Sequence, residues 1–351
     1  MTFQWQLLAI YQSICLLLVT CECCWGFATG IMYQLATDVS EVWFPAHQHA
    51  LATNINMSMM NVGFGISYLQ TMVLFNNSKS MSNADLQNHL NILIYSQSVP
   101  CLLVFVLIMF FYRESPKYPP SISQARRTGP GNISFLETID SIKILGKDYR
   151  FVIFAFIFGF NGAFGVTYPV IANLLITPSY NNSDKLVSVM GILAVAIGFV
   201  GCVLFSMILD KTKKFKTILM LLLIVSSALF TMFSEFLIHI YPVYVIYLIS
   251  TLAWFFFTPT TGVLADIISE ITYPINNSTS LAFCSVISGL FTAIVTQISG
   301  WLSDKRKVGI LDYMLCGILG IQILLLIGVP VVKKRSLSDS DGVISSSVEA
   351  T

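Results

Sequence analysis

Charge is what this chain of 351 residues has least of, since only 11% of its residues are charged whereas 55% are hydrophobic. A soluble globular domain carries about 25% charged residues, because its surface must face water. Basic residues are missing altogether before Lys79, and the net charge is only +1. This composition excludes a soluble enzyme and a nucleic-acid-binding domain, and it predicts a protein whose main solvent is lipid.

Cysteine and histidine also offer little chemistry. The eight cysteines fall inside apolar segments, where a thiol behaves as a small hydrophobe, so no disulfide framework is predicted. Glu22 lies among Cys21, Cys23 and Cys24, but adjacent residues on a helix point in different directions and cannot all bind one ion. The sequence offers no paired carboxylates or histidine-rich cluster for catalysis either. We therefore expect no metal, no cofactor and no enzymatic activity.

Long apolar runs are what the chain does contain. A helix needs about 20 mostly apolar residues to cross the hydrocarbon core with its backbone hydrogen bonds satisfied internally. The sequence therefore predicts an all-α membrane protein with nine transmembrane helices, at residues 8–36, 50–75, 90–112, 151–177, 186–209, 216–238, 241–269, 279–302 and 308–332.

Basic residues between these spans indicate their orientation, because cytosolic loops are rich in Lys and Arg. Most of the 19 basic residues lie in the segment 113–150, in the loop 211–216 and in the tail at 333–335. A nine-span topology places all three regions on one side of the membrane. We expect that side to be the cytosol, with the C-terminus on it, and the membrane to be the plasma membrane.

The basic segment divides the chain unequally, with three spans before it and six after it. Pro and Gly make residues 115–133 an irregular linker, and Ser134 and Glu137 form a capping box that opens an amphipathic helix along the membrane surface. Such a linker is typical of the midpoint of a transporter with two six-helix halves, so we expect the first three helices of the fold to be lacking. The predicted domains are a partial N-terminal half (1–112), a basic cytosolic linker (113–150), a six-helix half (151–332) and a Ser-rich cytosolic tail (333–351).

A charged motif closes the fifth span, in the segment Ser206-Met-Ile-Leu-Asp210-Lys-Thr-Lys-Lys. It approximates a pattern that major facilitator transporters place between the second and third helices of each half. There a carboxylate pairs with cations and with a neighbouring helix terminus, and the pairing changes between inward-open and outward-open states. The alternative is a short loop that simply holds acidic and basic residues.

Two further carboxylates, Asp266 and Glu270, lie four residues apart on one face of the seventh span. They need cations or water nearby, and the lysines that follow Asp210 are their expected partners. The alternative is a solvated helix end. The predicted gate, or conformational latch, comprises Asp210, Lys211, Lys213, Lys214, Asp266 and Glu270.

Polar and aromatic residues within the spans predict a path for a substrate, because polar groups are costly in lipid. A cavity lined by Asn, Ser, Tyr and Trp suits a small amphipathic or cationic organic molecule, which aromatic rings attract by cation–π interaction. For any one of these residues the alternative is a hydrogen bond between helices. The predicted substrate-binding residues are Asn61, Asn161, Tyr168, Trp254 and Ser285.

Four segments carry a resemblance to a known family: Trp43–Ala50, Arg113–Pro120, Leu209–Lys213 and Glu270–Pro274. Together they make the chain similar to the feline leukaemia virus subgroup C receptor-related family, solute carrier family 49 of the major facilitator superfamily. The resemblance implies the fold of that superfamily, with this chain beginning at the fourth helix. It also implies export of haem, or transport of choline or ethanolamine, by alternating access.

The family's choline site is matched only in part. Its aromatic cage takes a Trp from the first helix, which the resemblance places outside this chain, and a Tyr that falls on Gly165, with Tyr168 one turn later. Two family glutamines fall on Asn61 and Gly289, and Ser285 replaces an Asn. The resemblance therefore implies the scaffold but not choline as the substrate.

From these observations we expect a membrane transporter of a small organic solute, with haem, choline or ethanolamine implied by resemblance. Its surroundings are the lipid bilayer, and no nucleic acid is expected as a partner. The alternative is a truncated, non-transporting form that acts as a receptor or as a regulatory partner of a full-length carrier. Association with that carrier would distinguish the two.

Overall fold

A computed structural model shows a helical protein. It describes residues 35, 39–40, 42–45, 48–75, 82–113, 116, 135–180, 183–273, 275, 277–304 and 308–330. Most of the predicted first span, the linker residues 117–134 and the tail 333–351 lie outside these described residues. The helices are α2 (His49–Leu74), α3 (Asn83–Phe111), α5 (Phe135–Lys147), α6 (Tyr149–Ser179), α7 (Ser183–Thr212), α8 (Phe215–Ile238), α9 (Val243–Phe257), α10 (Pro259–Thr272), α11 (Asn277–Asp304) and α12 (Val308–Gly328).

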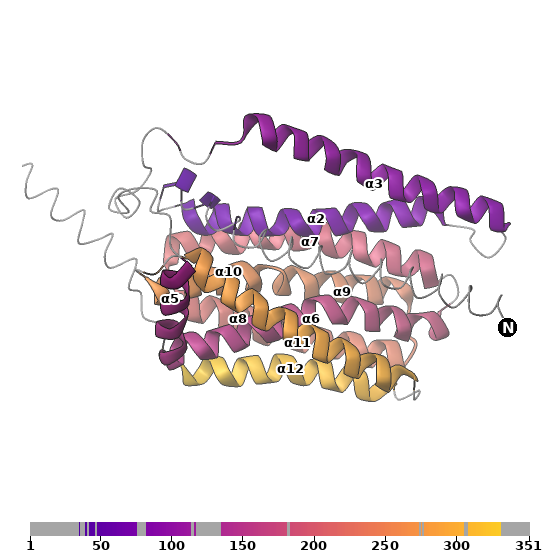
Figure 1. The fold of residues 1–351 in the computed structure, drawn as a ribbon. Coiled ribbons are helices and arrows are strands. Elements are labelled where there is room, and N and C mark those ends of the chain that lie inside the picture. Colours follow the sequence, from indigo (N-terminus) through magenta and orange to yellow (C-terminus); the bar gives the residue numbers. More distant parts are fainter. Residues whose placement is uncertain are drawn as a thin grey trace, which may run out of the picture.

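Helices α6 to α12 pack side by side as one bundle (Figure 1). Within it, α6 packs against α11 and α12, and α8 packs against α9 and α12. Helix α2 lies along α7 and also touches α10, so residues from the N-terminal part of the chain meet the C-terminal bundle directly. Helix α3 lies beyond α2 at the edge of the molecule (Figure 1).

Among the described residues, six helical segments are long and apolar enough to cross a membrane: Ala84–Phe111, Tyr149–Ala172, Lys185–Thr212, Phe215–Leu237, Val243–Thr272 and Thr279–Leu302. The spans expected at 50–75 and 308–332 also form helices, α2 and α12. The apolar part of α12, Tyr313–Gly328, is shorter than the others. Helix α2 is continuous, but polar residues interrupt its apolar sequence at Asn54, Asn56, Ser58 and Asn61. The expected all-α membrane architecture is confirmed.

Helix α5 lies across one end of the bundle, at a steep angle to the other helices (Figure 1), and contacts α6 and α11. The start of α6 and the end of α7 lie at this same end (Figure 1). The described parts of two of the basic segments, residues 135–150 and 211–216, thus lie at one end of the molecule. We call it the α5 end.

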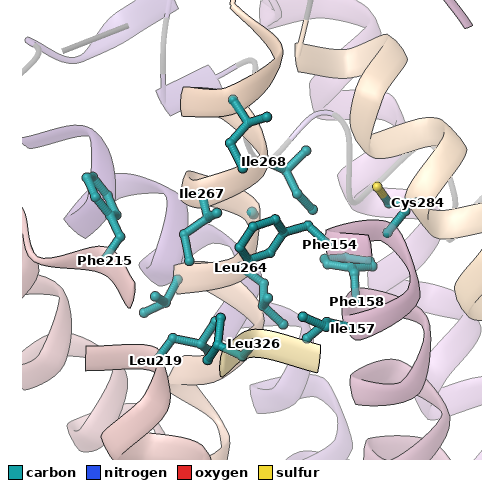
Figure 2. Close-up of a cluster of buried hydrophobic side chains, with 14 of the residues drawn as sticks. Phe154, Ile157, Phe158, Phe215, Leu219, Leu264, Ile267, Ile268, Cys284 and Leu326 are labelled. Atoms are coloured by element: carbon teal, nitrogen blue, oxygen red, sulfur yellow. The ribbon is translucent and has the colours of Figure 1, made fainter. Parts of the chain in front are cut away.

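The buried apolar side chains form two clusters along the bundle. One fills the α5 end and includes Phe154, Leu219, Leu264 and Leu326 (Figure 2). The other fills the opposite end and includes Phe164, which, like Phe154, lies on α6. Helices α6, α8, α11 and α12 each pass from one cluster to the other through a short stretch that contains Ser, Thr, Asn or Gln, whereas α9 contributes buried side chains only to the second cluster and α10 only to the first.

The span predicted at 241–269 corresponds to one membrane-spanning segment, Val243–Thr272, in which Pro259 separates α9 from α10. The proline nitrogen carries no hydrogen to donate, and its ring clashes with the carbonyl four residues earlier. That carbonyl belongs to Phe255, and a Cβ at Gly201 of α7 would collide with it. A glycine on α7 therefore makes room for the carbonyl that Pro259 leaves without its helical donor.

Candidate functional site

A layer of polar residues separates the two apolar clusters near the middle of the bundle. We call it the polar layer. Burial among hydrocarbon makes each of these groups costly unless it finds a hydrogen-bond partner, so their alignment at one depth marks this level as the candidate site. The described residues of the layer are Asn161, Ser226, Thr258, Thr260, Thr261, Ser285, Ser288 and Gln322.

Asn161 of α6 is the best-connected member of the polar layer and is only 2% exposed. Its amide nitrogen donates to the hydroxyl of Thr260 over 2.8 Å, and its amide oxygen accepts from the hydroxyl of Thr261 over 2.9 Å. Both threonines open α10, directly after Pro259. The predicted residue Asn161 thus ties α6 to the residues directly after Pro259 in the neighbouring span.

Threonine hydroxyls bond back to the helix on either side of Pro259. Thr258 donates to the carbonyl of Trp254 over 2.7 Å, and Thr260 donates to that of Phe257 over 2.6 Å. Neither is the carbonyl that Pro259 leaves without a donor, which belongs to Phe255. The backbone stays helical at Thr258, with φ −56° and ψ −40°, so the chain continues from α9 into α10.

Helix α2 presents its own polar face to this region. Asn54 and Ser58 are almost fully buried, and Ser58 donates to the carbonyl of Asn54 over 2.6 Å. A Cβ at Gly262 of α10 would collide with the amide of Asn54, so α2 and α10 approach closely at this glycine. Asn61, the predicted member of this face, is half-buried one turn farther along α2.

An aromatic cluster borders the polar layer on the side away from α5. Tyr168 stacks on Phe164 with ring centroids 4.9 Å apart and meets the edge of Phe230 at 4.6 Å. Phe230 in turn lies 5.6 Å from Trp254. The two predicted aromatic residues, Tyr168 and Trp254, thus belong to one cluster, in which both contact Phe230. Phe257 completes the cluster, because its ring contacts those of Phe164 and Trp254.

Two side chains in the polar layer carry buried polar atoms without a hydrogen-bond partner among the described residues. One is the hydroxyl of Ser285 on α11, which the sequence predicted as a substrate contact. The other is Gln322 on α12, whose side chain is fully buried and whose amide oxygen and nitrogen are both unpartnered. Sequence reasoning missed Gln322, although its position as a single amide within an apolar run was the signal.

Asp210 forms the link that its motif predicted between a carboxylate and a helix terminus. One of its oxygens accepts a hydrogen bond from the backbone N–H of Leu51, in the first turn of α2, over 3.0 Å. The other pairs with the ammonium of Lys213 at 3.1 Å, and the Asp210 side chain is only 9% exposed. The partial positive charge of a helix N-terminus stabilises such a carboxylate.

The remaining predicted gate residues lie at the same end but do not all join this link. Lys211 and Lys214 are exposed, and in the described part of the chain Lys213 is the lysine that pairs with Asp210. Asp266 is half-buried and Glu270 is buried on α10. Among the described ion pairs of the motif, Lys213 is joined to Asp210.

Comparison with known proteins places this geometry in context. Residues 2–271 match the family model of the Major Facilitator Superfamily. A choline/ethanolamine transporter, flvcr2a of Danio rerio, is 26% identical over 286 residues, which cover 81% of this chain and 59% of that protein. The choline/ethanolamine transporter FLVCR2 of Homo sapiens is 23% identical over 274 residues, which cover 77% of this chain and 51% of that protein.

A solved structure is also similar in fold. The fucose:proton symporter FucP of E. coli superposes with a TM-score of 0.56 at 14% sequence identity, covering 84% of this chain and 72% of that one. The chain spans less than two thirds of the length of the curated relatives above. The resemblance that the sequence motifs indicated is confirmed by these matches.

Proposed function

The chain belongs to the major facilitator superfamily, and from this premise we propose that it moves a small organic cation, of the choline or ethanolamine class, across the membrane by alternating access. The chain is an integral, multi-pass membrane protein. The observation that carries the proposal is the polar layer between two apolar clusters, with an aromatic cluster directly beside it.

The character of the site favours a cation that carries its own polar group. Rings of Trp, Tyr and Phe attract a desolvated ammonium through their negative faces, and Trp254, Tyr168 and Phe230 supply such rings. The hydroxyl of Ser285 and the amide of Gln322 are buried and unpartnered among the described residues. A bound solute with a hydroxyl or amine can give these groups the hydrogen bonds that burial otherwise denies them.

Of the substrates implied by resemblance, haem fits the residues of the polar layer less well than choline or ethanolamine. It would bring two carboxylates and an iron into the site, and these call for cations and for axial ligands such as histidine. In the described part of the polar layer the side chains are neutral amides and hydroxyls. The related transporters are themselves described as choline/ethanolamine transporters.

The link between Asp210 and α2 supplies the gate in this proposal. It joins the C-terminal bundle to a helix that precedes the linker, at the α5 end of the molecule. Opening that end requires α2 to move away from α7, which breaks the hydrogen bond to Leu51 and exposes the carboxylate. The contact therefore favours the conformation in which the α5 end is closed.

Binding of the solute by the purified chain tests the proposal most directly, because the chain spans about half to three fifths of its relatives' length. We expect saturable binding of radiolabelled choline or ethanolamine, weakened about tenfold by W254L through loss of the cation–π contact. F255L is the matched control, since Phe255 pairs with Phe205 on another side of α9. Equal binding by wild type and W254L, or no saturable binding at all, would contradict the proposal.

A further inference from the structure

The corner where α5 meets α6 combines exposed apolar side chains with two cations, the exposed Lys147 and the half-buried Arg150. Ile144 and Tyr149 are 61% and 57% exposed, although the neighbouring Leu145 is buried in the apolar cluster of the α5 end. Helix α5 is thus anchored by one side chain while its neighbours point outward. Exposed apolar side chains of this size beside a membrane span are typical of a surface that contacts lipid.

The cations at this corner differ in whether a carboxylate neutralises them. Lys143 pairs with Asp140 at 2.9 Å. In the described part of the chain neither Lys147 nor Arg150 forms an ion pair; Arg150 lies 5.6 Å from the centre of the Tyr149 ring. Asp148, between them, caps α6 by accepting the backbone N–H of Arg150 at 3.0 Å. Its charge also attracts the Arg150 guanidinium, which donates to the hydroxyl of Tyr149 over 3.4 Å. Lys147 and Arg150 together outweigh this one carboxylate, so they present net positive charge to whatever lies outside.

The position of the corner along the bundle indicates which part of the bilayer it faces. The apolar span of α6 begins at Tyr149, so this residue stands where hydrocarbon gives way to headgroups. Helix α5 runs across the end of the bundle rather than along it (Figure 1). Tyr at the boundary and Lys or Arg just beyond it are the side chains that suit the headgroup level of a bilayer.

We propose that this corner, formed by Ile144, Lys147, Tyr149 and Arg150, is a binding site for the headgroup of an anionic phospholipid. The two cations contact the lipid phosphate, and the two exposed apolar side chains enter the boundary of the acyl region. Attraction of basic residues to anionic lipid is strong enough at a membrane surface to select it over zwitterionic lipid. Bound lipid would hold α5 against the bilayer beside the start of α6.

Native mass spectrometry of the detergent-solubilised chain tests this proposal, using phosphatidylglycerol and phosphatidylcholine as the two probes. We expect phosphatidylglycerol to be retained in preference, and the double variant K147Q/R150Q to weaken its apparent affinity about tenfold or more, since each basic residue contributes to the attraction. The control is K211Q/K214Q, which removes the same charge from two exposed lysines at the same end of the molecule.

The outcomes separate a site from general surface charge. Equal retention of both lipids by the wild type overturns the proposal, as does an equal loss of affinity in the two double variants. The thermal unfolding temperature in phosphatidylcholine alone shows whether K147Q/R150Q is folded. If it is not, the variant I144S/Y149S replaces it, for which a loss of phosphatidylglycerol retention is expected and unchanged retention overturns the proposal. Solute binding is a separate measurement, so failure here leaves the proposed transport function standing.

Discussion

The carboxylate of Asp210 caps the first turn of a helix that begins 161 positions earlier in the chain, by accepting the backbone N–H of Leu51 over 3.0 Å. Gln48, the residue at the local cap position of α2, makes no side-chain capping bond. The first turn of α2 is therefore satisfied by a residue of the C-terminal bundle. This arrangement couples the end of α7 to the start of α2 through a hydrogen bond between a carboxylate and a backbone N–H.

Replacing Asp210 should separate the effects of charge and hydrogen bonding. D210N keeps an acceptor for Leu51, whereas D210A removes both the acceptor and the partner of Lys213. We expect D210A to lower the free energy of unfolding by about 1 kcal/mol, the usual cost of losing a helix cap, and D210N to cost less. Thermal unfolding of the purified variants measures this. A loss as large in D210N as in D210A would show that the cap contributes little.

Gly201 is predicted to be indispensable where α7 meets the span that contains Pro259. A Cβ there would collide with the carbonyl of Phe255, and backbone cannot move aside as a side chain can. We expect G201A to destabilise the chain by about 1–3 kcal/mol through overpacking. G289A is the control, since nothing lies within 4 Å of a Cβ at Gly289; there alanine should be neutral or stabilising, because it favours helix by about 1 kcal/mol. Similar unfolding temperatures for the two variants would contradict this prediction.

Two buried amides should respond oppositely to removal. Gln322 has no partner among the described residues, so Q322L should leave the unfolding temperature unchanged or raise it. Asn161 holds two hydrogen bonds, and N161L should cost about 1–3 kcal/mol because Thr260 and Thr261 lose their partner. Both changes replace an amide by a side chain of similar size. Strong destabilisation by Q322L would indicate that Gln322 is satisfied by a buried water or by another part of the chain.

Lys216 and Lys214 provide a matched test of one helix end. The ammonium of Lys216 donates to the carbonyls of Ile327 and Val329 at 3.1 and 2.8 Å, which closes the end of α12 against α8. Lys214, two residues earlier, is exposed. We expect K216M to cost about 1.5–3 kcal/mol, as for hydrogen bonds from a charged group, and K214M almost nothing. Indistinguishable unfolding curves for the two variants would refute the capping role.

The helices were predictable from the sequence because apolar runs and charged loops mark them directly. The expected spans at 186–209 and 216–238 correspond to α7 and α8, whose boundary the polar segment after Asp210 sets. The span predicted at 241–269 corresponds to Val243–Thr272, but the effect of Pro259 inside it was not predicted. A proline within a membrane helix can kink it or end it, and here Gly201, far away in sequence, gives room to the carbonyl that the proline leaves without a donor.

The site was predictable only in its residue types. Asn161, Trp254 and Ser285 stood out because polar and aromatic side chains are conspicuous in apolar helices. Their partners did not, since Thr260 and Thr261 read as ordinary threonines until α6 and α10 are placed side by side. The motif indicated that Asp210 would meet a neighbouring helix terminus, but not which one, because the backbone N–H of Leu51 that it caps has no signature in the sequence.

The split of the buried apolar side chains into two clusters has a mechanical consequence. Close-packed hydrocarbon resists deformation and tends to move as a block, so each end of the bundle is stiff within itself. The stretch between them holds hydroxyls and amides, whose hydrogen bonds can be exchanged one for another, and Pro259, which removes one helical hydrogen bond, falls in that same stretch. Bending concentrated there would let one end of the protein swing while the packing of both ends stays intact.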